Sequence, residues 1–224
     1  MLRDEWERLK RKYGHSKCLL AMHFLGKCVK NLYHIPKFRK KITICGKDNF
    51  CPYVPEGLAV EIIGDGNTVE IDPSIQTYNG RLSIGDWDSP ANGCCVRIGK
   101  GCTSNGVKIV LLEDKSRLTI GDDCMFSWDV DIYLSDFHSI YLSHSKEIIN
   151  KGKELIIGNH VWIGMNATVL KNSLIPDHSI VGAHSVVAGK FEETNCVLAG
   201  NPAKVVKRAI DWSRSYPNLY QTEK

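Results

Sequence analysis

Residues 157–188 decide the fold, and they divide into segments of six: IGNHVW (157–162), IGMNAT (163–168), VLKNSL (169–174), IPDHSI (175–180) and VGAHSV (181–186), followed by VA (187–188). A branched aliphatic residue opens each segment: Ile157, Ile163, Val169, Ile175, Val181 and Val187. The fifth residue of each complete segment is compact: Val161, Ala167, Ser173, Ser179 and Ser185. This period fits neither an α-helix, with about 3.6 residues per turn, nor an ordinary strand, with about two.

A six-residue repeat of this type indicates a triangular coil, in which each hexapeptide forms one flat face and one corner. The aliphatic residue points into a narrow prism, the compact residue fills the inside of the corner, and the other positions face outward. Three hexapeptides complete one coil, and coils stack by parallel backbone pairing. Burying each aliphatic side chain contributes roughly 1.5–3 kcal/mol, enough in sum to fix the register. We therefore predict an all-β fold, a parallel β-helix.

The same pattern recurs upstream with insertions. Repeats start at Ile84-Gly85-Asp86, Ile98–Cys102 and Ile120–Cys124, and the six-residue step continues through Phe126 and Ile132 to His138. The period then breaks, which predicts a loop that leaves the coil over about residues 139–155. The β-helix domain as a whole is predicted to span residues 46–200.

The two ends of the chain differ from the repeats. Helical spacing of Trp6, Leu9 and Tyr13, followed by a second apolar pattern and several lysines, predicts a basic helical segment over residues 1–45. We expect this segment to cap the main domain or a neighbouring subunit; the alternative is peripheral contact with a membrane surface through residues 1–41. Asn201-Pro202 predicts the start of a short helix, so that residues 201–224 form a C-terminal helix and tail.

Composition restricts the classes of function. The chain has 224 residues and a formal net charge of +4, without a basic patch interleaved with aromatic residues, so nucleic-acid binding is not expected. The nine cysteines form no C-x-x-C pair, which predicts neither a zinc site nor a disulfide framework, and no metal is expected. The start MLRDEWER (1–8) is too charged for a signal peptide, and the longest apolar run, Cys18–Leu25, is too short to span a bilayer. These features predict a cytoplasmic protein.

Three segments make the sequence resemble a known family: IGNHVWIG (157–164), IPDHSIVG (175–182) and AGNPAKVV (199–206). They are similar to the hexapeptide-repeat acyltransferases, which include galactoside, maltose and xenobiotic acetyltransferases. The resemblance is strongest to the capsule branch, notably the polysialic-acid O-acetyltransferases, through Ile120–Met125, Asp136–His138, Ile149–Gly152 and Asn195–Gly200. It covers about residues 110–213.

The resemblance implies a left-handed parallel β-helix, a homotrimer, and acetyl-CoA bound in the groove between adjacent prisms. It implies transfer of the acetyl group to a hydroxyl of a sugar or bacterial surface polysaccharide, sialic acid included. The family histidine aligns with His138, which would accept the hydroxyl proton while the oxygen attacks the thioester. Asp136 or a backbone carbonyl would orient the imidazole. The alternative is that His138 is a surface residue at the end of a coil.

Further positions correspond to binding residues of the family. Trp162 is expected to contact the pantetheine arm or the acceptor sugar, or else a trimer neighbour, and His144 in the loop is a second candidate for the acceptor. The positions next to coenzyme A correspond to Gly164, Met165, Ala183 and Ala188. Lys204 and Lys207 are expected to share a face of the terminal helix and hold the nucleotide phosphates, or else to form a solvated face. Ala188-Gly189 replaces the Thr-Lys or Tyr-Lys pair of many relatives, so one family contact is missing.

Two other groups of reactive side chains have simpler interpretations. His160, His178 and His184 occupy the same position of their repeats, and we expect solvated turn residues there. Cys102 and Cys124 fall at inward corner positions, which favours direct acyl transfer over an acyl-cysteine intermediate.

Three alternative functions remain open at this stage. The same chemistry could act on an amino or hydroxyl group of a nucleotide sugar or small molecule. A γ-type carbonic anhydrase would need three convergent histidines around a metal. A non-catalytic β-helix scaffold would bind no coenzyme A.

Overall fold

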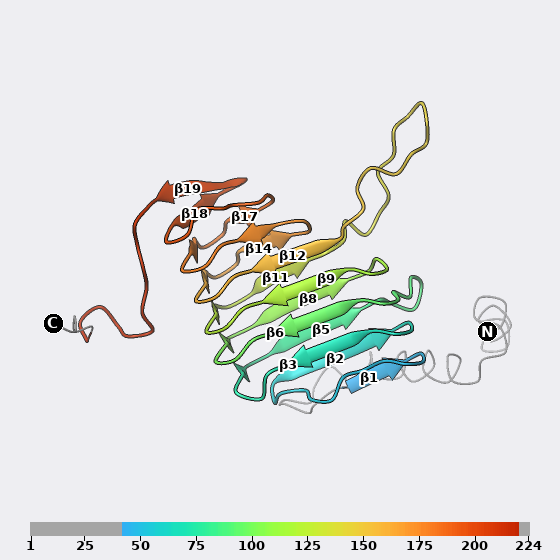
Figure 1. Cartoon of the computed structure of the whole chain (residues 1–224), viewed down its shortest axis with the longest axis horizontal. Helices are drawn as coiled ribbons and strands as arrows, with labels where there is room; N and C mark the ends of the chain where they lie inside the picture. The colour runs from blue at the N-terminus through green and yellow to red at the C-terminus, as the bar shows by residue number, and fades with distance from the viewer. Residues whose placement is uncertain (1–41, 220–224) are drawn as a thin grey trace, which may run out of the picture. The chain divides into compact units, whose positions relative to one another are not determined.

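The computed structural model describes residues 42–219, and within this range the chain forms a stack of strands without an α-helix (Figure 1). The predicted N-terminal helical segment lies outside the described residues, except that its last four positions form strand β1 (Ile42–Cys45). No helix in residues 42–219 is long and apolar enough to cross a lipid bilayer.

The chain passes through three sheets in turn, here called A, B and C. Sheet A contains β1, β2 (Leu58–Ile63), β5 (Gly80–Ile84), β8 (Val107–Leu111), β11 (Val130–Tyr133), β14 (Thr168–Leu170) and β17 (Val186–Val187). Sheet B contains β3 (Thr68–Ile71), β6 (Cys95–Ile98), β9 (Arg117–Ile120), β12 (Glu154–Ile157) and β15 (Leu174–Ile175). Sheet C contains β4 (Gln76–Thr77), β7 (Thr103–Ser104), β10 (Met125–Phe126), β13 (Trp162–Ile163), β16 (Ile180–Val181), β18 (Val197–Gly200) and β19 (Ala203–Lys207).

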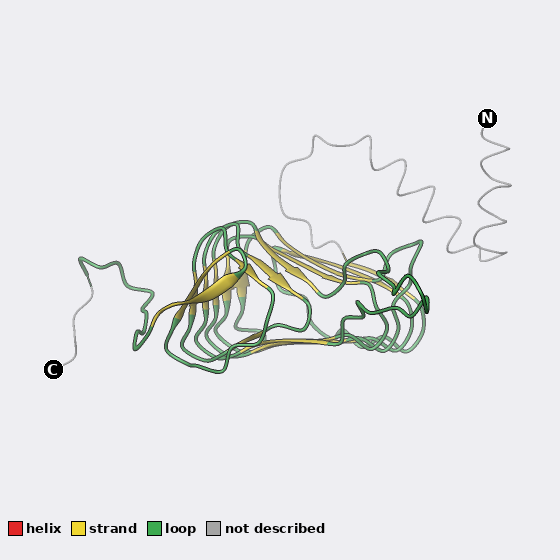
Figure 2. Cartoon of the chain, turned by 90° about the horizontal axis from the view of Figure 1, so that it is seen from above, coloured by secondary structure: helices red, strands yellow, loops and turns green. Residues whose placement is uncertain are grey.

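Successive coils superpose as a three-sided prism when seen along the stack (Figure 2). All strand pairs are parallel among the described residues, except that β18 and β19 are antiparallel. Parallel neighbours are expected where each strand pairs with the one a full coil later. The parallel β-helix predicted from the six-residue period is therefore confirmed.

The inward positions of the prism are those that the repeat predicts. The six aliphatic residues that open the segments of 157–188 are each 0% exposed. In sheet B, register places Ile71, Ile98, Ile120, Ile157 and Ile175 in one column. The compact residues lie inside the corners and are at most 2% exposed. Like side chains therefore stack on like side chains from coil to coil, which is how a narrow lumen is filled without voids.

The corners use a left-handed backbone conformation that the side-chain pattern also explains. The fourth residue of five consecutive segments has a positive φ: His160 (52°), Asn166 (55°), Asn172 (62°), His178 (56°) and His184 (57°). Asn, Asp and His are the residues other than glycine that adopt this conformation most often. Turn geometry therefore accounts for the presence of histidine at these three corner positions.

The prediction of a C-terminal helix is wrong. Asn201-Pro202 lies in a tight turn, and Ala203–Lys207 returns as strand β19, antiparallel to β18. The reason is tertiary: without β19, the edge of β18 would be left unpaired at the end of sheet C, and an added strand satisfies those backbone groups. Local helical spacing over so few residues is too weak to compete.

The predicted departure from the coil is present between β11 and β12, where the chain protrudes from the stack (Figure 1). This segment carries an antiparallel bridge between Tyr141 and Ile148. The C-terminal arm, residues 208–219, leaves on the opposite side of the stack in both views (Figures 1 and 2). The two irregular segments therefore belong to different corners of the prism.

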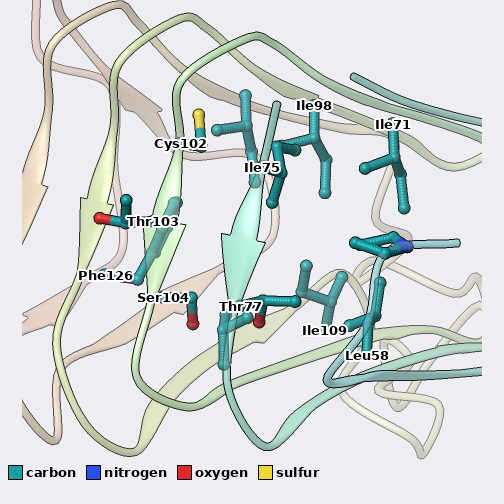
Figure 3. A pocket seen from close by; sticks show the side chains of 13 residues that line it. Leu58, Ile71, Ile75, Thr77, Ile98, Cys102, Thr103, Ser104, Ile109 and Phe126 are labelled. Atoms are coloured by element: carbon teal, nitrogen blue, oxygen red, sulfur yellow. The ribbon is translucent and has the colours of Figure 1, made fainter. Parts of the chain in front are cut away.

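A small apolar cavity lies inside the prism near the first strands of sheet C (Figure 3). Two buried hydroxyls line it among aliphatic side chains, those of Thr77 and Ser104. Ser104 Oγ accepts a hydrogen bond from the Gly106 N–H at 3.2 Å. Thr77 Oγ1 has no hydrogen-bond partner among residues 42–219. A buried hydroxyl without a partner costs free energy of folding.

We predict that Thr77→Val stabilises the protein by about 1 kcal/mol, because valine keeps the volume and removes the uncompensated desolvation of the hydroxyl. The midpoint of thermal unfolding, followed by circular dichroism at fixed protein concentration, should increase by roughly 2–4 °C. Ser104→Ala is the matched control, since its hydroxyl makes a hydrogen bond, and it should leave the midpoint unchanged or lower it. A lower midpoint for Thr77→Val would contradict this account of the cavity.

Candidate active site

His138 lies where the chain leaves the corner between sheets A and B, directly after β11. The turn is fixed locally: Phe137 has a positive φ of 64°, its N–H donates to Ser135 Oγ at 3.0 Å, and the His138 N–H donates to the Asp136 carbonyl at 2.7 Å. The His138 side chain is exposed and its ring makes no hydrogen bond within residues 42–219. Both ring nitrogens are therefore available to a substrate.

A polar cleft opens beside His138, between the protruding loop and the coils below it. It is lined by Asp86, Ser89, Glu113, Ser135 and Asn150, together with apolar atoms of Leu112, Phe137 and Ile148. Carboxylates, hydroxyls and an amide next to an exposed imidazole can hydrogen-bond the hydroxyls of a sugar. The cleft is thus suited to a polar acceptor.

Asp136 does not contact the imidazole; its carboxylate fastens the loop instead. Lys171 Nζ donates to Asp136 Oδ2 and to the Asn150 carbonyl, and the Lys171 side chain is only 13% exposed. Asn150 Nδ2 donates to Asp136 Oδ2 at 2.9 Å and to the His138 carbonyl at 2.8 Å. Asn150 Oδ1 accepts the Ile140 N–H at 2.8 Å. We call Asp136, Asn150 and Lys171 the loop clamp; it ties both ends of the loop to the coil.

The clamp keeps Asp136 ionised. Partial desolvation raises the pKa of this carboxyl, but the hydrogen bonds from Lys171 and Asn150 and the charge of Lys171 outweigh it, so the pKa lies below its ordinary value. A carboxylate whose pKa is lowered by folding stabilises the folded state above the unfolded pKa of about 4. That contribution is lost as the pH falls further, through the folded pKa.

Trp162 lies far from His138 in the fold, on the outward side of sheet C. Register places it in one column with Thr103, Met125, Ile180 and Val197. Its indole Nε1–H donates to Ser127 Oγ at 3.3 Å. A single chain therefore does not bring the predicted base and the predicted aromatic contact together.

The residues expected to contact coenzyme A occupy three places. Gly164 and Ala183 lie at the corner between sheets C and A, as does Met165, which is 42% exposed. A side chain at Gly164 would place Cβ 2.7 Å from the Ala183 nitrogen, so glycine is required there by the stacking of coils. Ala188 is exposed at the corner between sheets A and B, on the same edge as His138. The single chain does not gather these positions into one pocket.

Lys204 and Lys207 share a face, although not on a helix. In β19 they pair with Ala199 and Val197, which flank the buried Leu198 and so point outward. A register shift in this pairing allows two residues three apart to lie on one side of the strand. Both lysines are exposed, and Lys207 continues the outward column of sheet C that contains Trp162.

His144 and the two cysteines lie in different parts of the fold. His144 is exposed in the protruding loop, away from the coil. Cys102 and Cys124 are 2% and 0% exposed inside the prism, and their thiols donate to the carbonyls of Gly121 and Gly158. The inward position predicted for both cysteines is confirmed.

Sequence reasoning missed a cluster at the corner between sheets B and C. His160 was expected to be solvated, but its side chain is only 22% exposed, since the Trp212 ring stacks on it with centroids 4.2 Å apart. His160 Nδ1 lies 2.6 Å from Asp123 Oδ2, and Arg214 binds the same carboxylate. Desolvation lowers the pKa of His160, but its hydrogen bonds to Asp123 and to the Trp212 carbonyl outweigh this and raise it. No periodic pattern connects residue 160 with residue 212, so this contact could not be predicted from the sequence.

Comparison with known proteins supports the β-helix fold and indicates the class of protein to which this chain is similar. Residues 155–189 match the family model described as "Bacterial transferase hexapeptide (six repeats)". Together with the three parallel sheets, this match defines a left-handed parallel β-helix built from hexapeptide repeats, as predicted. The resemblance to hexapeptide-repeat acyltransferases is thereby confirmed.

Among the hexapeptide-repeat proteins, the chain is similar to several polysialic acid O-acetyltransferases. The chain is 49% identical over 113 residues to the polysialic acid O-acetyltransferase of Escherichia coli O1:K1 / APEC, covering 50% of this chain and 36% of that one. It is 45% identical over 121 residues to the polysialic acid O-acetyltransferase of Neisseria meningitidis, covering 54% and 56%. The crystal structure of the polySia specific acetyltransferase NeuO superposes with a TM-score of 0.63 and 29% identity, over 80% of this chain and 91% of that one. The chain thus spans about a third to a half of the length of the two curated relatives.

We predict that Lys171→Met loosens the loop, because hydrogen bonds to a charged group contribute about 1.5–3 kcal/mol each. The open population of the loop should increase about ten- to a hundredfold. Limited proteolysis with trypsin, scored by cleavage after Lys146 in the loop, measures this. Lys153→Met is the matched control, since that lysine is exposed at the last position before β12 and forms no ion pair among the described residues. Equal cleavage rates for the two variants would contradict the role of the clamp.

Proposed function

We propose that the protein is an acetyl-CoA-dependent O-acetyltransferase that modifies a hydroxyl of a bacterial surface polysaccharide, with sialic acid as the favoured sugar. The identity to two polysialic acid O-acetyltransferases carries this proposal. The exposed His138 at the edge of a polar cleft supports it independently. Location in the cytoplasm and peripheral membrane contact through residues 1–41 stay predictions.

The proposed reaction is direct transfer. His138 accepts the proton of the acceptor hydroxyl while the oxygen attacks the thioester carbonyl. The new C–O bond forms, the C–S bond of acetyl-CoA breaks, and the thiolate of coenzyme A takes up a proton. Backbone N–H groups of a neighbouring coil are the expected donors to the oxyanion. The burial of Cys102 and Cys124 disfavours a cysteine nucleophile.

The proposal includes a homotrimer, because the site is incomplete in one chain. His138 lies at the corner between sheets A and B, whereas Trp162 and Lys207 lie on the outward side of sheet C. A three-fold arrangement of prisms sets one corner of each chain against a face of the next. The groove between two chains would then contain the base of one and the aromatic and basic contacts of the other.

We predict that His138→Ala lowers turnover by roughly 10²–10⁴-fold, because the hydroxyl loses its general base. The assay follows acetyl-CoA consumption with polysialic acid, other glycans, nucleotide sugars, serine and chloramphenicol as acceptors. His184→Ala is the matched control, an exposed histidine at a different corner, and it should retain activity. Near-normal turnover in His138→Ala would remove this residue from the mechanism. A preference for a nucleotide sugar or small molecule would replace the proposed acceptor.

We predict complementation between two inactive variants, His138→Ala and Trp162→Ala. If each site takes its histidine from one chain and its tryptophan from the next, random mixing leaves about a quarter of the sites with both residues intact. The co-expressed pool of trimers should therefore regain about a quarter of wild-type activity. Mixed trimers that stay as inactive as either parent would show that the two residues do not form a site between chains.

A further inference from the structure

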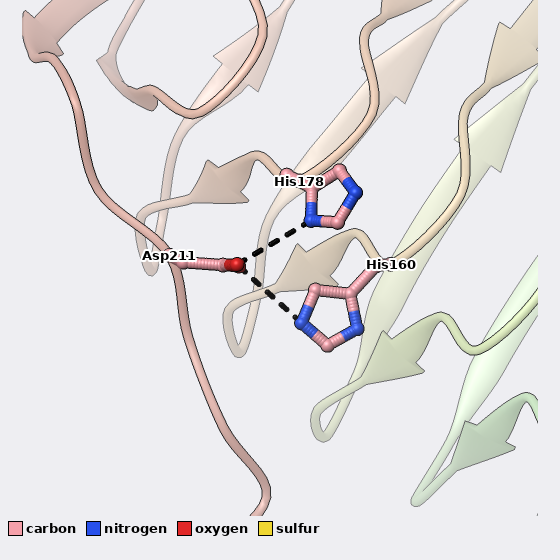
Figure 4. Close-up of side chains that lie close together, drawn as sticks. All are labelled: His160, His178 and Asp211. Carbon is pink, nitrogen blue, oxygen red and sulfur yellow. Dashed lines mark ion pairs between the residues drawn. The ribbon is translucent and has the colours of Figure 1, made fainter. Parts of the chain in front are cut away.

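The corner between sheets B and C gathers three side chains that ligate metals. His160 and His178 occupy equivalent turns of successive coils, and Asp211 of the C-terminal arm lies between them (Figure 4). One ligand atom of each lies within 4.8 Å of the others. These residues stand apart from His138, which is at another corner of the prism.

Two of the spacings, each to a different oxygen of Asp211, match the edge of a tetrahedral zinc site. Bond lengths of about 2.0–2.2 Å place neighbouring ligand atoms roughly 3.3–3.6 Å apart. Asp211 Oδ1 is 3.4 Å from His160 Nε2, and Asp211 Oδ2 is 3.5 Å from His178 Nδ1. The ligand atoms of the two imidazoles lie within 4.8 Å of each other, so the third edge requires a rotation of the His178 side chain, which is 46% exposed.

His160 is oriented as histidine ligands are. Its other ring nitrogen, Nδ1, lies 2.6 Å from Asp123 Oδ2, and Arg214 Nη2 holds the same carboxylate at 2.8 Å through Oδ1. A carboxylate behind a ligating histidine fixes the tautomer and directs the free nitrogen to the metal. Here that nitrogen is Nε2, and it faces two acceptors, Asp211 Oδ1 and the Trp212 carbonyl at 3.0 Å. Because Asp123 already takes the proton on Nδ1, the acceptors that face Nε2 require either a second proton or a cation at that nitrogen.

His178 supplies an independent observation. Its Nδ1 is buried as an atom and has no hydrogen-bond partner among residues 42–219. The Asp211 carboxylate, at 3.5 Å, is within ion-pair range but makes no hydrogen bond with it. A buried ring nitrogen that faces a carboxylate without a hydrogen bond is an unsatisfied polar group, and a bound ion would satisfy it.

We propose that His160, His178 and Asp211 bind a zinc ion that fastens the C-terminal arm to the prism. Two imidazoles and a carboxylate suit zinc better than magnesium or calcium, which prefer oxygen ligands. The Trp212 carbonyl, 3.0 Å from His160 Nε2, is the candidate for the fourth position. Zinc takes the place of the proton on His160 Nε2. It also keeps the Trp212 ring stacked on His160, where the centroid of the Trp212 ring lies 6.1 Å from that of Trp162. The proposed site departs from the expectation of no metal, and it requires neither acetyl transfer nor His138.

The test titrates Zn²⁺ into the chelator-treated full-length protein by isothermal calorimetry. Wild-type protein should bind one Zn²⁺ per chain, and His178→Ala and Asp211→Asn should each abolish this binding. Asp123→Asn, behind His160, should weaken it by roughly 10–100-fold. His184→Ala is the matched control, because it removes a histidine from the equivalent turn at another corner, and it should bind as wild type. Co²⁺ substitution should give a spectrum without thiolate charge-transfer bands, which excludes the cysteines as ligands.

A second readout follows the arm itself. Saturating Zn²⁺ should slow tryptic cleavage after Arg214 at least tenfold in wild type and in His184→Ala, but not in Asp211→Asn. Three results would each overturn the proposal: no stoichiometric Zn²⁺ uptake, uptake that is equal in wild type, His178→Ala and Asp211→Asn, or an arm equally protected with and without metal. The last result would mean that protonated His160 alone holds the arm. Neither readout depends on acetyltransferase activity, so failure of the zinc proposal leaves the proposed function untouched.

Discussion

The structure depends on the narrow lumen of the prism, which each hexapeptide of residues 157–186 fills with one branched aliphatic side chain and one compact side chain. Each of the six residues from Ile157 to Val187 is fully buried, and each stacks on its counterpart one coil away. A shift of one residue would turn this entire set outward, at a cost of roughly 1.5–3 kcal/mol for each side chain. The lumen therefore fixes the register, and the register fixes which residues appear on every outward face and corner.

The periodic part of the fold could be predicted from sequence because its contacts repeat. The inward columns, the compact corner residues and the departure after β11 all follow from one period. The C-terminal segment could not be predicted in this way: β19 forms because β18 would otherwise leave an unpaired edge, which no local pattern at Asn201-Pro202 reveals. The position of His138 was predictable from its place in the repeat. The partners of Asp136 were not, since Lys171 lies on the next coil.

The two irregular segments are held to the regular coil by the same means. The protruding loop and the C-terminal arm contribute little to the lumen, so charged side chains at the corners fasten them instead. Lys171 joins both ends of the loop through Asp136 and Asn150, and the pair of Asp123 and His160 holds the arm through Arg214 and Trp212. Ion pairs and hydrogen bonds of this kind are directional, so they can set the orientation of a segment where apolar packing is absent.

A convex prism has flat faces, and this limits where chemistry can occur on it. Acyl transfer requires a concave site that positions two substrates and excludes water from the thioester. Within residues 42–219, His138 lines a cleft between the loop and the coils, whereas Trp162 and Lys207 lie on another face. In the proposed homotrimer, a second prism supplies the missing wall. The same rigid stacking that makes the lumen predictable leaves oligomerisation, rather than a change of fold, as that proposal's route to a complete site.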